Sequence, residues 1–260
     1  MSRIEWPRAR RRVGVFGPRL RIRYIDQHFV EHAVAADAAA GIAFERSRMV
    51  RRIPSYPGQK HTPGRYWSAT LGHLIEFESW LECQWLTVLD FDPQVVGMAS
   101  QPLEFDGADP DGAWRHVPDI FVRLADGSAR LVDVKNPDHH DRDDVQRQAR
   151  RTRAACADLG WGYQFVGAIE AQRWRNISWL SAYRRPLHGG IDLIPRILAL
   201  TTRPVTLAEL LSFLDESAIV LPVIFHLCWR GQLVFDLDAP MRQNTVLRQP
   251  EHTPAEVPSR

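Results

Sequence analysis

Two carboxylates and one lysine lie on two neighbouring segments of strand-like sequence. Asp119 lies within residues 116–124, and Asp133 and Lys135 end residues 128–135. Side chains alternate between the two faces of a strand, so Asp133 and Lys135 point the same way. Two carboxylates held close together repel each other unless a cation lies between them, and oxygen ligands suit Mg²⁺ or Mn²⁺. Such a metal lowers the pKa of a bound water molecule, and an adjacent ammonium stabilises the charge that develops during phosphodiester hydrolysis.

The turn between the two segments determines whether Asp119 joins the other two residues. A two-residue turn would put Asp119 on the opposite face of the sheet. A three-residue turn over 125–127, with Gly127 in the left-handed conformation, would place it opposite Asp133. We predict the three-residue turn. The alternative is an exposed hairpin with a cross-strand ion pair, and on this spacing alone that is the more common case.

The surrounding sequence predicts the elements that must position these residues. Apolar residues recur at helical spacing from Leu71 to Phe91, and the Asp92-Pro93 turn ends this helix. Glu78 and Glu82 would lie one turn apart on it and share a face. With the elements around the hairpin, this predicts an α/β or α+β core. Those further elements are a strand over 95–105, a Gly/Asp/Pro loop over 106–113, a helix over 141–159, a strand over 163–169 and a helix over 174–183.

The sequence pattern changes after Pro186. Thr206 and Glu209 form a capping box at the start of the second of three predicted helices. The helices cover 191–200, 207–214 and 218–229, and a short strand follows over 232–237. Three helices followed by a strand suggest a winged helix-turn-helix domain. The third helix has almost no polar side chains, so we expect it to be buried or to bind a partner rather than to read DNA bases.

Composition limits the class of protein. The 260 residues carry a formal net charge of +2, with 45% hydrophobic and 25% charged residues, as in an ordinary globular protein. The longest apolar run, residues 218–229, is too short to cross a bilayer, and the Arg-rich N-terminus lacks the apolar stretch of a signal peptide. The three cysteines are far apart and form no CxxC motif, which disfavours a zinc site and disulfides. We therefore expect a cytoplasmic protein with no membrane partner.

Basic charge is concentrated near the N-terminus. Residues 1–23 contain eight arginines, and Glu5 is their one acidic residue. We predict a basic N-terminal arm over 1–65, a usual electrostatic footprint for nucleic acid, although a solvated tail explains the charge equally well. The candidate DNA contacts are Arg10, Arg11 and Arg12 in this arm, and Arg147, Arg150 and Arg151 on the helix that follows the hairpin.

Lysine is scarce in this chain. Of the 33 basic residues, Lys60 and Lys135 are the two lysines. Arginine does not replace lysine where a compact, titratable ammonium is needed. The presence of lysine at position 135 therefore indicates a specific requirement there.

Two stretches around the candidate residues resemble the PD-(D/E)XK nucleases, and more narrowly the TnsA-like endonuclease subunits of heteromeric transposases. The stretches are FESWLECQWLTVLDFDPQVVGMASQP (77–102) and HVPDIFVRLADGSARLVDVK (116–135). The family motifs fall on Ser79 and Glu82, residues 90–95, Gln101-Pro102, Pro118-Asp119 and residues 133–135. The resemblance covers roughly residues 66–185, and the order of the C-terminal elements agrees with it.

The resemblance implies a fold and a set of catalytic residues. The implied domains are a PD-(D/E)XK restriction-endonuclease-like core over 66–186, a winged-helix domain over 187–240 and a disordered tail over 241–260. Glu82, Asp119 and Lys135 are implied as catalytic. The founding pattern has Gln where this chain has Asp133, and a carboxylate there binds metal more directly. We expect Glu82, Asp119 and Asp133 to hold Mg²⁺ or Mn²⁺, with Lys135 assisting the attacking water.

The leading hypothesis is a Mg²⁺-dependent DNA endonuclease subunit that hydrolyses phosphodiester bonds at transposon ends and cuts the non-transferred strand. The resemblance implies double-stranded DNA, a DDE-type transposase subunit and an AAA+ regulator as partners. One alternative is a non-catalytic DNA-binding or assembly protein that retains the nuclease fold. The other is a stand-alone restriction-type nuclease, which would cut by itself at a defined sequence.

Overall fold

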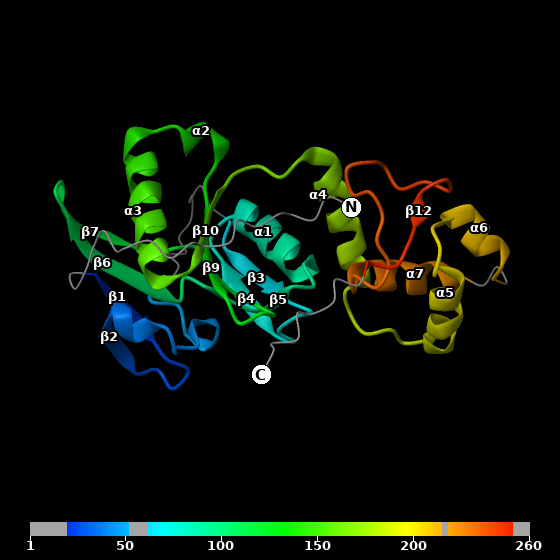
Figure 1. The fold of residues 1–260 in the computed structure, drawn as a ribbon, viewed down its shortest axis with the longest axis horizontal. Helices are drawn as coiled ribbons and strands as arrows, with labels where there is room; N and C mark the ends of the chain where they lie inside the picture. Colours follow the sequence, from blue (N-terminus) through cyan, green and yellow to red (C-terminus); the bar gives the residue numbers. More distant parts are fainter. Residues whose placement is uncertain (1–19, 52–61, 215–217, 252–260) are drawn as a thin grey trace, which may run out of the picture. The chain divides into compact units, whose positions relative to one another are not determined.

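The computed structural model describes residues 20–51, 62–214 and 218–251, which form a mixed α/β protein (Figure 1). The chain divides into two compact units, each described by itself below. Of the described residues, those up to Ile169 form the N-terminal unit and those from Glu170 onward form the C-terminal unit. None of the helices in the described ranges is both long enough and apolar enough to cross a membrane.

The N-terminal unit is built around a four-stranded sheet in the order β10-β9-β8-β5. Its strands are β5 (Val95–Ser100), β8 (Ile120–Leu124), β9 (Ala129–Val134) and β10 (Gly162–Val166). The first three pair antiparallel, whereas β10 runs parallel to β9. A parallel pair needs a long crossover, which α2 (Pro137–His140) and α3 (Asp143–Leu159) provide. All residues of β9 are buried, as expected for a strand covered on both faces.

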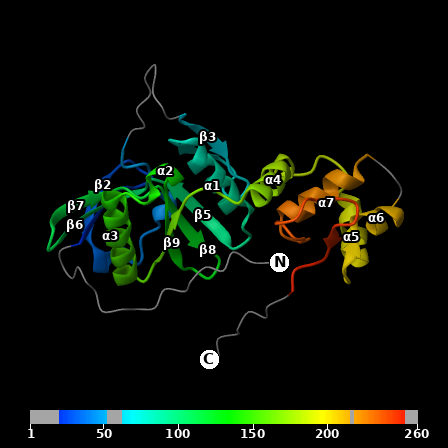
Figure 2. The same cartoon turned by 90° about the horizontal axis from the view of Figure 1, so that it is seen from above.

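Helices α1 and α3 cover opposite faces of this sheet (Figure 2). On one face, α1 (Trp80–Phe91) packs Leu86 in the same core cluster as Val132 of β9. On the other face, Cys156 of α3 shares a cluster with Leu131. Even-numbered side chains of β9 thus lie toward α1, and odd-numbered ones lie toward α3.

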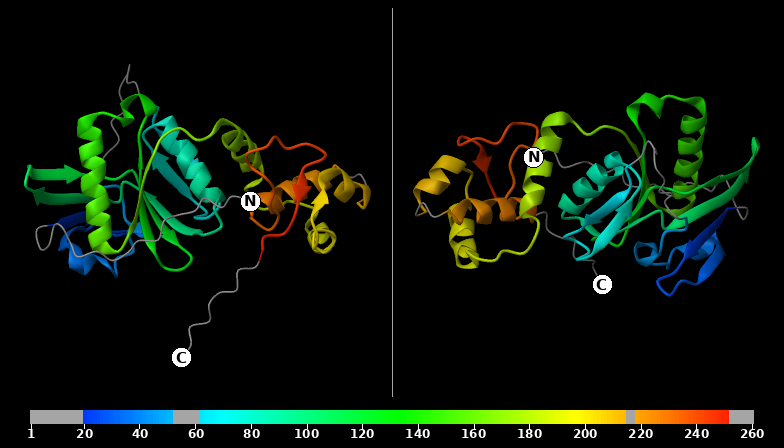
Figure 3. Two further views of the ribbon diagram at one scale, coloured as in Figure 1. Left: turned by 45° about the horizontal axis from the view of Figure 1, so that its top comes forward. Right: turned by 180° about the vertical axis from the view of Figure 1, so that it is seen from behind.

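A second four-stranded sheet, in the order β2-β1-β6-β7, shares the core cluster of α3. Its strands are β1 (Arg21–Ile25), β2 (Glu31–Ala35), β6 (Leu103–Asp109) and β7 (Gly112–His116). Figure 3 shows the tip of the β6–β7 hairpin extending beyond the rest of this sheet. The unit is completed by short 3-10 helices at Ala36–Ala39 and Phe44–Arg46 and by the hairpin of β3 (Gly64–Trp67) and β4 (Leu74–Phe77).

The C-terminal unit is mainly helical. Its helices are α4 (Ala171–Leu180), α5 (Ile194–Leu200), α6 (Leu207–Ser212) and α7 (Val220–Trp229), with 3-10 helices at Ser181–Tyr183 and Ile191–Leu193. A small sheet pairs β11 (Val205–Thr206) with β12 (Val246–Leu247). Most side chains of the apolar helix α7 are buried, as the sequence predicts.

The predicted three-residue turn between β8 and β9 is confirmed. Gly127 has a φ of +82°, and its N–H donates to the Leu124 carbonyl at 2.9 Å. The Leu124 N–H in turn donates to the Ser128 carbonyl at 2.9 Å. From this turn the ladder runs in a single register to its last pair, Ile120 with Val132. Glycine is needed in the turn because other residues pay a steric cost at positive φ.

Two predicted helix ends are also confirmed. Helix α3 ends at Gly160, whose φ of +71° places it in the left-handed region typical of a residue that ends a helix. Helix α6 begins with the capping box of Thr206 and Glu209. In both cases the local hydrogen-bonding chemistry determines the boundary.

The predicted helix over 71–91 is wrong in its first half. Residues 74–77 form β4, which pairs with β3, and α1 begins only after Ser79. The side chains of β4 alternate between exposed and buried, with Ile75 and Phe77 inward. The alternation covers only the four residues of β4, so the longer helical pattern around it obscures this strand signal. Glu78 therefore precedes the helix instead of sharing a face with Glu82.

Three other predicted elements differ from the structure. The predicted loop over 106–113 instead forms the end of the β6–β7 hairpin. Its strands pair as far as Asp109 and Gly112, and a short turn joins them. The predicted strand over 95–105 is divided into β5 and β6 at Gln101, which has a φ of +46°. The predicted strand over 232–237 is a single bridge from Val234 to Arg248, so the small sheet is formed by β11 and β12 instead.

The domain bounds also differ from those predicted. Residues 20–51, expected within a basic arm, are folded, since β1 pairs with β6 and Ile22 is fully buried. The C-terminal unit begins at residue 170 rather than 187, because Asn176 of α4 donates to the Leu237 and Ala239 carbonyls at 2.8 Å. Within the expected tail, β12 pairs with β11. Residues 1–19 and 52–61 of the arm and residues 252–260 of the tail lie outside the described residues.

Candidate active site

Asp119 and Asp133 lie opposite each other at one end of the β8–β9 hairpin. The ladder ends with Ile120 and Val132, and these two aspartates are the next residues in register. The backbone N–H of Asp119 donates to Asp133 Oδ1 at 3.3 Å. The register that the Gly127 turn sets therefore brings the two residues into contact.

The Asp119 carboxylate completes the ladder of the hairpin. Its Oδ2 accepts the backbone N–H of Val134 at 2.7 Å, just beyond the last β8–β9 pair. On the other side, the Asp119 carbonyl accepts the N–H of Gln101 at 2.9 Å. A side-chain oxygen thus takes the place of a main-chain acceptor before β8 begins. These bonds hold the half-buried side chain at the end of the sheet.

The Asp133 carboxylate is buried on the α3 face and held by three donors. Its Oδ2 accepts His116 Nε2 and the Tyr163 hydroxyl, each at 2.8 Å, and its Oδ1 accepts the Asp119 N–H. The side chain is 6% exposed. Burial, followed by the nearby Asp133 charge, raises the pKa of the Tyr163 hydroxyl well above its ordinary value. Asp133 is therefore held in a fixed orientation by its hydrogen bonds.

Glu82 caps the helix that carries it. Ser79 Oγ accepts the Glu82 N–H at 3.2 Å and donates to Glu82 Oε1 at 2.8 Å. Glu82 Oε2 accepts the backbone N–H of Glu78 at 2.9 Å. Burial raises the pKa of the Glu82 carboxyl and Glu78 adds repulsion, whereas these hydrogen bonds and the Arg51 charge oppose the rise. The Ser79 and Glu82 pair of the family motif thus has a structural role in starting α1.

Electrostatic repulsion links three of the carboxylates. The pKa of Asp119 lies well above its ordinary value of 3.8, first because the carboxyl is desolvated and then because Asp133 and Glu82 carry negative charge nearby. The Val134 N–H and the Lys135 ammonium oppose this rise. Asp119 is therefore influenced both by Asp133 on the α3 face and by Glu82 on the helix that covers the other face.

Lys135 follows directly after β9. Its N–H donates to the Val166 carbonyl at 2.8 Å, which extends the parallel pairing with β10 by one bond. The side chain is half-buried, and its ammonium forms none of the ion pairs seen among the described residues. Since it lowers the pKa of Asp119, the ammonium lies within electrostatic reach of that carboxyl.

A cluster that sequence reasoning missed adjoins Asp119. Arg51 Nη2 donates to Glu78 Oε2 at 2.6 Å, and its Nε donates to Gln101 Oε1 at 3.0 Å. Gln101 is 1% exposed, and its backbone N–H binds the Asp119 carbonyl. Glu78 Oε1 and Gln101 Nε2 are buried without a partner among the described residues. The Gln101-Pro102 dipeptide gave a sequence signal for this cluster, but nothing in the sequence linked it to Arg51.

The donor set suits a hard divalent cation in its chemistry, although the described geometry is not a preformed metal site. Both oxygens of Glu82 and Oδ2 of Asp133 already accept hydrogen bonds. Asp119 Oδ1 accepts none from the described residues. Within the described ranges, no group of three or more His, Cys, Asp or Glu residues is arranged to hold a metal ion. Binding through all three carboxylates would require Glu82 to release a capping donor.

The candidate DNA-binding arginines differ in their surroundings. Arg147 and Arg150 are exposed on α3. Arg151 instead binds Asp109 through Nε and Nη2 at 2.6 and 2.9 Å, and its guanidinium lies 6.0 Å from the centre of the Trp114 ring. This pairing lowers the pKa of Asp109 and gives Arg151 a structural role that we did not predict. The candidates Arg10, Arg11 and Arg12 lie outside the described residues.

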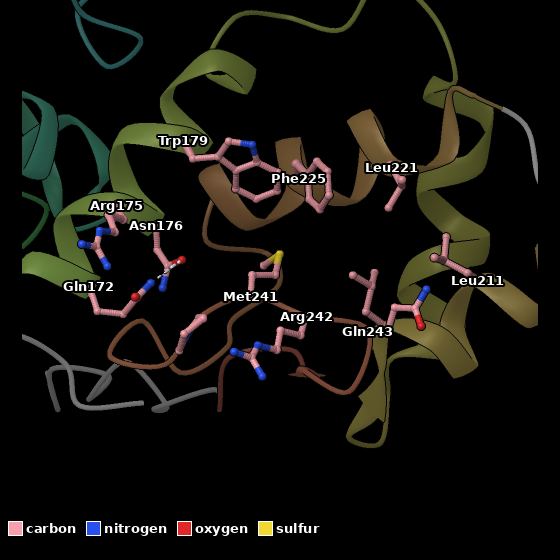
Figure 4. A pocket seen from close by; sticks show the side chains of 12 residues that line it. Gln172, Arg175, Asn176, Trp179, Leu211, Leu221, Phe225, Met241, Arg242 and Gln243 are labelled. Carbon is pink, nitrogen blue, oxygen red and sulfur yellow. Dashed lines mark hydrogen bonds between the residues drawn. The ribbon is translucent and has the colours of Figure 1, made fainter.

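The C-terminal unit contains a pocket of about 570 Å³ (Figure 4). Trp179, Leu221 and Phe225 form part of its apolar wall, with the Trp179 and Phe225 ring centres 4.3 Å apart. Arg175 and Arg242 line the same pocket and are exposed, and no carboxylate is among the described residues that line it. The pocket therefore suits an apolar group that carries negative charge beside it.

Comparison with known proteins adds no family assignment. No protein-family model matches the chain, and no curated protein is significantly similar to it. The candidate site therefore depends on its own residues, their spacing and their geometry.

Proposed function

We propose that this chain is a metal-dependent DNA endonuclease subunit of a transposase, which hydrolyses phosphodiester bonds of the non-transferred strand at transposon ends. The observation that carries the proposal is the register of the β8–β9 hairpin. It places Asp119 opposite Asp133 and within electrostatic reach of Lys135, and the pKa of Asp119 is raised by the neighbouring carboxylates. Repelling carboxylates beside an ammonium that lacks a described ion-pair partner are typical of a functional site rather than of a solvated hairpin.

In this proposal Asp119 is the central metal ligand, and Asp133 and Glu82 complete the donor set. Mg²⁺, or Mn²⁺ in its place, would supply Lewis acidity toward the phosphate and would activate a water molecule when bound. His116 and Tyr163 hold Asp133 in place. The Lys135 ammonium, with no ion-pair partner among the described residues, is available to donate to the attacking water or to a phosphate oxygen.

The order of elements in the N-terminal unit supports a PD-(D/E)XK-like core. Helix α1, strand β5 and the β8–β9 hairpin follow in the order of the motifs on which the resemblance rests. The motif residues Ser79 and Glu82 begin α1, and Gln101-Pro102 follows β5. For the C-terminal unit, helices α5 to α7 support a winged-helix-like arrangement, although its strands are β11 and β12 rather than the predicted segment.

The proposed function includes double-stranded DNA at transposon ends, a DDE-type transposase subunit and an AAA+ regulator as partners, in the cytoplasm. The exposed Arg147 and Arg150 of α3 are proposed contacts to the DNA backbone. The apolar pocket with Arg175 and Arg242 is the proposed docking surface for an acidic segment of a partner protein. The burial of α7 supports assembly rather than base reading by this unit.

The test is cleavage of supercoiled plasmid DNA in Mn²⁺ by the wild-type chain and by Asp119→Asn, assayed with and without a transposase subunit supplied in trans. We expect the wild type to nick the plasmid and Asp119→Asn to lose at least about 100-fold in rate, as expected when a metal ligand or a key electrostatic group is removed. DNA binding, measured by fluorescence anisotropy, should be unchanged in the variant. Equal Mn²⁺-dependent cleavage by the two proteins would refute the site.

A non-catalytic DNA-binding or assembly protein is the second candidate, and one observation favours it. The oxygens of Glu82 and Oδ2 of Asp133 are engaged in hydrogen bonds that already explain why these residues are present. This candidate predicts DNA binding without cleavage in every combination of metal and partner. A stand-alone restriction-type nuclease would instead cut without a partner and give discrete fragments from linear DNA.

A further inference from the structure

The guanidinium of Arg51 is fixed beside the candidate site yet remains half exposed. One nitrogen donates to Gln101 and another to Glu78, so the group is held at two points. Its side chain is 49% exposed, and Nη1 donates to none of the described residues. Because Arg51 binds Glu78, which precedes the N-cap Ser79, its positive charge lies near the N-terminus of α1, where it opposes the rise in the Glu82 pKa.

The residues that hold Arg51 are themselves unusual. Gln101 is a buried non-glycine residue at a φ of +46°, a conformation that costs backbone energy and is concentrated at functional sites. Its amide nitrogen is buried without a partner among residues 20–51, 62–214 and 218–251, and so is the second oxygen of Glu78. Buried polar atoms normally have a partner, so these two atoms can accommodate a further polar group beside Arg51. Strain and unpaired atoms therefore occur together around one exposed cation.

Two cations from distant parts of the sequence thus act on the carboxylates through their charge. The charge of Lys135 acts on Asp119, and that of Arg51 acts on Glu82, whose charge acts in turn on Asp119. A phosphodiester bound at the carboxylates would bring negatively charged oxygens toward both cations. Arginine suits this role because its planar group can hold its protein partners and still offer further N–H donors to a phosphate.

We propose that Arg51 contacts a backbone phosphate of the DNA substrate and that Gln101 and Glu78 are positioning residues for its guanidinium. This inference rests on the proposed endonuclease function. It adds a phosphate contact by Arg51, a residue outside the stretches that carry the family resemblance. It also assigns a role to the strained conformation of Gln101.

The test compares Arg51→Ala with Arg23→Ala, a matched control in the same unit. Arg23 pairs with Glu104 at 2.6 Å, the same distance as Arg51 with Glu78. The exposed fractions of the two side chains are 47% and 19% in the Arg23 pair, and 49% and 19% in the Arg51 pair. We expect Arg51→Ala to lower kcat/KM for Mn²⁺-dependent cleavage by about 10- to 100-fold, the range for one lost hydrogen bond to a charged group. Arg51→Lys should recover part of the loss, and Arg23→Ala should cleave at the wild-type rate.

A second measurement separates a phosphate contact from a purely structural ion pair. Cleavage positions are first mapped on a duplex oligonucleotide, and single neutral methylphosphonates are then placed at each phosphate around the cut. A methylphosphonate at the phosphate that Arg51 contacts should slow cleavage by the wild type about as much as Arg51→Ala slows cleavage of the unmodified duplex. On that modified duplex, Arg51→Ala should cleave no more slowly than the wild type. The inference would be overturned if Arg51→Ala lost the same factor in cleavage rate on every duplex. It would also be overturned if a lower Tm of Arg51→Ala accounted for the lost activity.

The outcomes distinguish this inference from the function on which it rests. If the wild type cleaves, Asp119→Asn does not, and Arg51→Ala behaves like Arg23→Ala, the endonuclease function stands and the role of Arg51 is refuted. If the wild type does not cleave under any condition, the proposed function fails and the inference fails with it.

Discussion

Asp119 has two roles that oppose each other. Its carboxylate oxygen accepts the Val134 N–H and so closes the ladder at the end of the hairpin. The same group carries a charge beside Asp133 and Glu82, and burial together with this repulsion raises its pKa. A side chain that supports the fold through an oxygen but weakens it through a charge is typical of a site selected for function at the expense of stability.

Asp119→Asn should separate these roles, because it keeps the acceptor oxygen and removes the charge. A raised folded-state pKa means that the ionised carboxylate destabilises the native protein above that pKa. The penalty decreases as the pH falls and is lost below the ordinary value of 3.8. Asp119→Asn should therefore have a higher Tm than the wild type at pH 7 in EDTA, with a difference that vanishes toward pH 3.8. Thermal unfolding between pH 4 and 8 measures this, and a lower Tm at pH 7 would contradict it.

Metal binding provides the control for that comparison. Mn²⁺ at about 100 times its Kd would stabilise the wild type by about 2.7 kcal/mol, or roughly 5–10 °C in Tm for a chain of this size. Asp119→Asn should lose most of this shift. An equal shift in both proteins would show that the ion binds elsewhere.

At this scale, the part of the site that depends on local spacing could be predicted from sequence. Asp133 lies in β9 and Lys135 directly follows this strand, and the turn at Gly127 determines where Asp119 lies. The contact between Arg51 and Gln101 could not be predicted, because 50 residues separate them and tertiary packing alone brings them together. The capping role of Glu82 also follows from a sequence motif, S-x-x-E, which predicts a helix start as readily as a metal ligand.

The element that sets the geometry of the site is the β8–β9 turn. An added Cβ at Gly127 would meet nothing within 4 Å, so its positive φ alone opposes substitution. Gly127→Ala should therefore destabilise the protein by about 1–2 kcal/mol, the cost of the left-handed conformation. Gly127→Asn should cost less, because asparagine adopts that conformation more readily. Urea unfolding measures both changes.

Gly41 offers a matched control for that prediction. An added Cβ there also meets nothing within 4 Å, but its φ lies outside the left-handed region. Gly41→Ala should leave stability unchanged or increase it slightly, since it reduces the freedom of the unfolded chain. A similar loss of stability in both variants would mean that backbone strain is not the cause.

Secondary structure could be predicted wherever a single period or a specific end signal dominated. The capping box at Thr206 and the end of α3 at Leu159 fall where the sequence places them. The segment over 71–79 was assigned to the helix because the short alternation of β4 is compatible with the helical pattern that continues into α1, although the S-x-x-E motif at Ser79 signals a helix start. The β6–β7 hairpin was mistaken for a loop, since its Gly- and Asp-rich strands gain their stability from pairing rather than from intrinsic propensity.

At the scale of the whole molecule, each unit contains one fully buried cysteine. Cys156 lies in the N-terminal unit and Cys228 in the C-terminal unit, and burial raises the pKa of Cys228 to about 12 and that of Cys156 well above its ordinary value. Cys83 is half-buried. Since the thiolate is the reactive form, a thiol reagent at pH 8 should label Cys83 first. The two buried thiols should react only when their units unfold.

These thiols make the stability of each unit separately measurable. Labelling at increasing urea, followed by peptide mass spectrometry, should give one unfolding midpoint from Cys156 and another from Cys228. Identical midpoints would show that the two units unfold together. Rapid labelling of either thiol in the absence of urea would contradict the burial on which the prediction rests.

The hydrogen bond from Val134 to Asp119 has a consequence for how this protein can change over generations. Selection for folding alone would retain Asp or Asn at position 119, because either supplies the oxygen that closes the ladder. Lys135 has no ion-pair partner among the described residues, and in a chain where Lys60 is the one other lysine, relaxed selection should let it drift to arginine. If the proposed endonuclease function holds, we therefore expect descendants that have lost the reaction to carry Asn at position 119 or Arg at position 135, and descendants that cut DNA to keep both Asp119 and Lys135.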